Sequence, residues 1–111
     1  MDTVEQAVIV HLPLKGGAFG SADELARMRA LEEEIADAVE GNFVGEFDGN
    51  EVGGNEFTLF MYSRDADRLF LTIEPILKSS PAAEGGRATI RYGGVDEPSV
   101  REREVTWGAV T

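Results

Sequence analysis

His11 is the only histidine of the chain, and histidine is the side chain that most readily exchanges a proton near neutral pH. A histidine that acts as a general base needs a nucleophile and an orienting carboxylate within hydrogen-bond distance. No residue spacing in the sequence identifies a nucleophile or a carboxylate that would serve His11 in this way. A metal site built from His11 with Asp48 or Glu56 would follow no recognisable ligand pattern. The sequence therefore favours a packed or surface histidine, and we expect no catalytic residue and no metal site.

A glycine-rich segment, LKGGAFGS at residues 14–21, lies where a strand should lead into a helix. Amide groups at such a helix N-terminus can hold an anion. The segment lacks the lysine-serine ending of a P-loop, and its glycines miss the dinucleotide-binding spacing. Asp23 and Glu24 would also occupy the place of the anion. The segment therefore predicts a tight strand-to-helix connection, and we expect no cofactor.

The segment DGNEVGGNE, residues 48–56, has spaced carboxylates and invites comparison with a calcium loop. It lacks the twelve-residue spacing and the terminal glutamate of an EF-hand loop. Its glycines and asparagines are the residues that a chain reversal needs. We interpret it as the turn of a hairpin within residues 45–62.

Phe60 and Tyr62 stand two residues apart, as do the aromatic residues on which RNA-recognition domains stack bases. The basic surroundings of that motif are missing, and the net charge of the chain opposes RNA. We favour an apolar patch made by Ile9, Phe60 and Tyr62 on an open sheet face, a surface suited to self-association or to a ligand.

Four of the ten basic residues fall on the last two predicted strands: Arg87, Arg91, Arg101 and Arg103. Cross-strand pairing with Glu102 and Glu104 is favoured over a grip on an anionic ligand or partner. The candidate surface for a ligand or partner therefore consists of His11, Phe60, Tyr62, Arg87 and Arg91.

The 111 residues suffice for one domain, residues 1–111, with an ordinary hydrophobic core. The lack of cysteine excludes disulfides, thiolate metal sites and cysteine nucleophiles, and it fits a reducing cytoplasm. We find no signal peptide, and no stretch approaches the roughly 18 apolar residues that a membrane helix needs. A net charge of -11 makes nucleic acid and anionic membranes poor partners.

Two helices are predicted from caps and apolar periodicity. Ser21 with Glu24 forms a capping box, so the first helix should begin at Ala22 and stop near Gly41. Asp65 should cap a second helix, in which Pro75 predicts a kink or an early end.

Alternating apolar residues predict the strands. They cover residues 4–12, 42–48, about 57–62, 87–92 and 99–107, the last following a turn at GGVDEP, residues 93–98. Right-handed crossovers place the first and third strands in the middle, the fourth beside the first, and the second beside the third. The sequence thus predicts an α+β, ferredoxin-like βαββαβ sandwich with both helices on one face and an additional C-terminal edge strand.

Residues 45–77, GEFDGNEVGGNEFTLFMYSRDADRLFLTIEPIL, followed by ATIRYG, resemble a set of short bacterial hypothetical proteins. A DGNE-type turn, an Asp-Ala-Asp helix opening and an Arg-Tyr-Gly strand end recur in that set. The resemblance implies a ferredoxin-like fold and transfers no catalytic residue. In fold and charge alone, the chain also resembles the ferredoxin-like inhibitors of bacterial ribonucleases, acidic proteins that bind another protein.

We therefore expect a small cytoplasmic protein that acts by binding and not by catalysis. The first hypothesis is a protein-interaction or inhibitory module, based on the acidic helix positions Glu32, Glu33, Glu34 and Asp37. The alternative is a small-ligand sensor that uses the open sheet face, alone or as a homodimer. An enzyme built around His11 is the third hypothesis.

Overall fold

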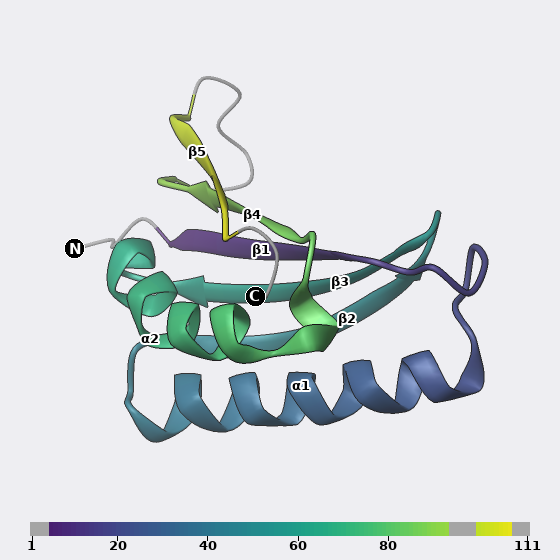
Figure 1. Cartoon of the computed structure of the whole chain (residues 1–111). Helices are drawn as coiled ribbons and strands as arrows, with labels where there is room; N and C mark the ends of the chain where they lie inside the picture. The colour runs from purple at the N-terminus through teal and green to yellow at the C-terminus, as the bar shows by residue number, and fades with distance from the viewer. Residues whose placement is uncertain (1–4, 94–99, 108–111) are drawn as a thin grey trace.

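The computed structural model describes residues 5–93 and 100–107. Its elements, in chain order, are β1 (Gln6–Pro13), α1 (Ala22–Gly41), β2 (Glu46–Gly53), β3 (Glu56–Ser63), α2 (Ala66–Ser79), a short 3-10 turn η1 (Pro81–Ala83), β4 (Arg87–Arg91) and β5 (Glu102–Thr106). The strands form one antiparallel sheet in the order β2-β3-β1-β4-β5, and the two helices lie against one side of it (Figure 1). This is the predicted ferredoxin-like order with an added edge strand. Of the predicted turn at 93–98, only Gly93 lies within the described residues.

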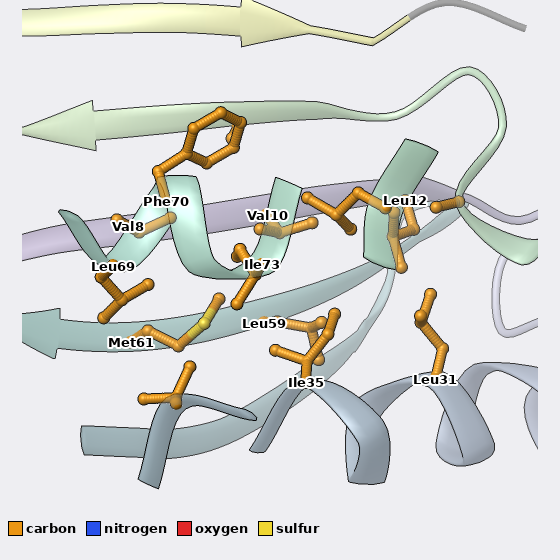
Figure 2. Packing of buried hydrophobic residues seen from close by; sticks show 14 of the residues in the cluster. Val8, Val10, Leu12, Leu31, Ile35, Leu59, Met61, Leu69, Phe70 and Ile73 are labelled. Atoms are coloured by element: carbon orange, nitrogen blue, oxygen red, sulfur yellow. The ribbon is translucent and has the colours of Figure 1, made fainter. Parts of the chain in front are cut away.

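The core lies between the sheet and the two helices. Val8, Val10 and Leu12 of β1 alternate toward the helices, as the sequence pattern predicts, and all three are fully buried. They meet Ile35 of α1 and Ile73 of α2 in one apolar cluster (Figure 2). Burial of one face of the sheet against both helices is the main source of stability, since each large apolar side chain contributes about 1.5–3 kcal/mol.

The first helix begins as predicted, because the Ser21 hydroxyl accepts a hydrogen bond from the Glu24 amide at 3.1 Å. It ends at Gly41, but the left-handed residue that closes it is Phe43, with φ 55°. The Phe43 and Val44 amides donate to the carbonyls of Glu40 and Val39, the two bonds of a Schellman cap. Residues 42–45 therefore cap the helix, and the strand predicted at 42–48 begins only at Glu46.

The β2–β3 hairpin turns at Gly54 and Asn55, whose φ angles of 60° and 67° are the positive pair that a type I′ turn requires. Gly49, which the sequence also offered for a reversal, instead lies at a bulge within β2, where the pairing with β3 shifts. The Leu14 amide donates to the Asn55 carbonyl, and the Asn55 amide donates to the Ala18 carbonyl, so the glycine-rich segment holds the hairpin tip.

The second helix starts at the Asp65 cap, as predicted, but it does not end early at Pro75; it continues to Ser79. Proline leaves the carbonyl four residues earlier, that of Leu71, without its helical donor. The Leu71 side chain is 65% exposed, so this carbonyl lies on the outer side of the helix, where water can serve it. Ile73 and Leu77 are fully buried on the other side and keep both halves of the helix on the sheet.

Candidate functional site

The side of the sheet that carries no helix is here called the open face. Three rows of side chains cross it from β2 to β5. They are Glu46, Tyr62, Ala7, Arg91 and Glu102; Gly49, Phe60, Ile9, Thr89 and Glu104; and Glu51, Thr58, His11, Arg87 and Thr106. The five candidate residues of the sequence therefore share one face.

His11 and Arg87 are neighbours on this face, and both lie close to Glu56, the first residue of β3. Arg87 donates a hydrogen bond of 2.7 Å to Glu56, and its Nε lies 3.6 Å from the Glu104 carboxylate. The hydrogen bond from Arg87 lowers the pKa of Glu56 below its usual value, with a further contribution from the charges of Arg87 and His11. The His11 Nδ1 atom lies 3.4 Å from Glu56, but it is buried and has no hydrogen-bond partner among the described residues.

Arg87 and Arg91 follow the cross-strand pairing that the sequence favoured, whereas Arg101 and Arg103 make other contacts. Arg91 donates a hydrogen bond of 2.6 Å to Glu102 on the open face. Arg103 points to the helix side, where it lies 3.2 Å from Asp67 of α2, and the Tyr92 hydroxyl donates to the same carboxylate. These two donors, Tyr92 first, lower the pKa of Asp67. Arg101 lies over the Tyr92 ring, 4.5 Å from its centre. The two guanidinium groups on the open face, those of Arg87 and Arg91, thus form ion pairs with glutamates of the same chain.

The apolar centre of the open face is small. Ile9 and Phe60 are direct cross-strand partners, and Tyr62 lies beside Ala7 in the next row. Ile9, Phe60 and Tyr62 are each only partly exposed, and Ala7 is buried. Neighbouring side chains shield part of each of these residues from solvent, so the open face has only a small apolar patch with charged residues around it.

The glycine-rich segment binds a carboxylate of the same chain, that of Glu24. The Glu24 carboxylate accepts hydrogen bonds from the amides of Lys15 at 2.7 Å and Gly16 at 2.9 Å. These bonds, led by the one from Lys15, lower the pKa of Glu24. A side chain added at Gly16 would lie 2.7 Å from the Ser21 amide, so the close approach requires glycine there. The segment is a structural connection, as its sequence predicts.

Acidic residues gather on α1 and β2, which pack side by side and are joined by hydrogen bonds from the Asn50 amide to the Glu32 carboxylate. The two elements carry ten of the 21 acidic residues and only two of the ten basic ones. Seven exposed carboxylates lie along α1 and along the β2 edge, with Glu46 and Glu51 on the open face, and we call them the acidic surface: Glu33, Glu34, Asp37 and Glu40 of α1 with Glu46, Asp48 and Glu51 of β2. None of the seven forms an ion pair with another described residue.

A cleft of about 570 Å³ lies at one end of this surface, where the end of α1, the start of β2 and the start of α2 meet. We call it the end cleft. Its lining includes Glu40, Phe43, Glu46, Tyr62, Arg64 and Arg68. Phe43 is not among the candidate residues predicted from the sequence, because its apolar side chain fits a strand pattern. The signal that could have identified its position is the Gly41-Asn42 pair after a long helical stripe, which is typical of a helix end.

Within residues 5–93 and 100–107, no three side chains of the metal-ligating types gather into a possible metal site. The same residues contain no helix that is both long enough and apolar enough to cross a bilayer.

The fold defines the class of the protein as α+β, with a ferredoxin-like sheet extended by one strand. Comparison of the chain with protein-family models, with curated proteins and with solved structures finds no match. The resemblance to short bacterial proteins therefore stays a prediction, and the function has to be argued from the surface.

Proposed function

We propose that the protein acts without catalysis, by binding another protein of basic character through the acidic surface. The observation that carries the proposal is the segregation of charge. Seven exposed carboxylates without an ion pair among the described residues lie on α1 and β2, whereas the arginines of β4, of β5 and just before β5 contact carboxylates or Tyr92. Such a surface attracts and orients a partner of opposite charge.

The edge position of β2 supports the same surface. One side of β2 pairs with β3, and its other side pairs with no strand in the described part of the chain. Glu46, Asp48 and Glu51 along it, with the bulge at Gly49, discourage pairing with another copy of this acidic edge. A basic partner would not be repelled by these carboxylates, so the β2 edge favours a basic protein over a second copy of this chain.

The experiment compares two variants of equal net charge. In the first, Glu33→Gln, Glu34→Gln and Asp37→Asn neutralise three carboxylates of the acidic surface. In the control, Glu74→Gln, Glu84→Gln and Glu102→Gln neutralise three carboxylates elsewhere on the protein.

Each protein is immobilised and exposed, at low and at high salt, to an extract of the cells that produce it. We expect the wild type and the control to retain the same protein at low salt and to release it as salt rises. The acidic-surface variant should retain much less. Capture of nothing at low salt, or equal loss in both variants, would contradict the proposal.

The proposal includes a cytoplasmic site of action, with which the lack of cysteine agrees, and a bacterial source, which rests on the resemblance to short bacterial proteins. It excludes nucleic acid as the partner, because a net charge of -11 repels phosphate. A ligand sensor or homodimer built on the open face is favoured less, because Arg87 and Arg91 already contact glutamates of this chain. An enzyme built around His11 is favoured less, because the hydroxyl beside the ring on the open face, that of Thr58, belongs to a buried residue.

A further inference from the structure

Phe43 contributes little to the stability of the free protein. Its side chain is 91% exposed, and its φ of 55° is the left-handed conformation that suits glycine or asparagine at the end of a helix. A bulky residue there strains the backbone and gains almost no burial in return. Strain of this kind persists where a side chain serves some other purpose, and Phe43 lines the end cleft.

Glu40, which also lines the end cleft, has an unfavourable electrostatic environment in the free protein. It lies in the last turn of α1, which holds no basic residue. The C-terminal end of a helix carries partial negative charge and favours cations. The cleft therefore combines an exposed aromatic ring with a negative charge at a negative helix end, two features that a bound cation would make favourable.

The remaining lining groups also favour a cation over an anion. Glu5 and Glu46 add two further carboxylates, against the guanidinium groups of Arg64 and Arg68. The start of α2 offers few free amides, because the Ala66 amide donates to the Gln6 side chain and the Arg68 amide donates to Asp65.

We propose that the end cleft binds a lysine or arginine side chain of the protein partner. The charged group would lie near Glu40 and Glu46, and its alkyl stem or guanidinium plane would lie against the rings of Phe43 and Tyr62. This inference rests on the proposed function and deepens it, because it names the part of the partner that the acidic surface receives. The cleft has the size of ordinary ligand pockets, so one long side chain fits within it.

The test uses two small probes and does not depend on the partner. N-acetyl-arginine amide carries the cation, and N-acetyl-citrulline amide has nearly the same shape without the charge. Each is titrated into the 15N-labelled protein at low salt, and amide chemical shifts are followed by NMR.

We expect the arginine probe to shift amides in residues 40–46 and 62–68, with saturation in the millimolar range. The citrulline probe should bind at least about fivefold more weakly. Phe43→Gly should weaken the arginine probe about two- to fivefold, which is the value of an exposed cation–π contact. Glu40→Gln should weaken it by a similar factor, and Glu74→Gln should leave it unchanged.

Equal binding of the two probes, shifts spread over α1 with none at residues 62–68, or indifference to both cleft variants would overturn the cleft assignment. Failure of the proposed function gives a different result, because a protein that captures no partner can still bind the arginine probe. Conversely, the capture of a partner protein could depend on Glu33, Glu34 and Asp37 but not on Phe43. That result would support the proposed function and contradict the assignment of the end cleft.

Discussion

Replacing Phe43 with glycine should stabilise the protein, although the change removes a large apolar side chain. A non-glycine residue in the left-handed region costs about 1–2 kcal/mol. At 91% exposure, the ring buries only about a tenth of its roughly 200 Å². At about 25 cal/mol per Å², that burial contributes about 0.5 kcal/mol. The net expectation for Phe43→Gly is a gain of about 0.5–1.5 kcal/mol in the free energy of unfolding.

Urea denaturation followed by circular dichroism measures the gain. For a domain of this size, an m-value of about 1–2 kcal/mol per M converts it to a midpoint shift of about 0.5 M upward. Phe43→Ala is the matched control, because it removes the same ring but keeps the strained backbone. It should be neutral or slightly destabilised. Loss of more than about 1 kcal/mol in Phe43→Gly would show that the ring packs against the fold, and the reasoning about the end cleft would then be wrong.

Other variants test the rest of the structure. Glu56→Gln should destabilise the protein at neutral pH by up to about 1 kcal/mol, since the glutamate is about a third exposed. Because Arg87 lowers the pKa of Glu56, its stabilisation is present above the usual value of 4.5 and is lost as pH falls below it. The difference between wild type and variant in urea midpoint should therefore shrink as pH falls from neutral through 4.5 and below, and a constant difference would contradict the ion pair. Glu24→Gln should lower the thermal midpoint and speed hydrogen exchange at the Gly16 amide; unchanged exchange would show that the carboxylate does not hold the loop. Ile35→Ala should cost about 2–5 kcal/mol by calorimetry, as expected for a fully buried side chain, and a loss below 1 kcal/mol would place Ile35 outside the core.

Most of the fold could be predicted because local patterns agree with the tertiary structure. The alternation of Val8, Val10 and Leu12 places one face of β1 on the helices, and the Ser21 and Asp65 caps set both helix starts. The crossover rules then leave one strand order.

Two element boundaries were predicted wrongly, one because a local helix cap was missed and one because tertiary packing overrides a local signal. Phe43 has the residue type of a strand, yet the cap bonds from Phe43 and Val44 to the last turn of α1 fix it in the left-handed region. Pro75 predicts a kink or an early end, and the early end is wrong because the burial of Ile73 and Leu77 holds the helix on the sheet on both sides of the proline.

The candidate surface was predictable only in part. Parity along the strands places His11, Phe60, Tyr62, Arg87 and Arg91 on one face, because alternation along a strand is a local property and the apolar side of each strand turns toward the core. The end cleft could not be predicted in the same way. Its lining comes from residue 5, residues 40–46 and residues 62–68, which only the packing of α1 against α2 and the sheet brings together.

Site-specific photo-crosslinking in living cells tests the central claim most directly. A photoreactive amino acid is placed at Asp37 on the acidic surface, or at Lys78 on the exposed side of α2 as the control. The account predicts that irradiation joins the Asp37 position, and not the Lys78 position, to one protein of basic character. An adduct only from Lys78, an adduct with a second copy of this chain, or no adduct from Asp37 would contradict it.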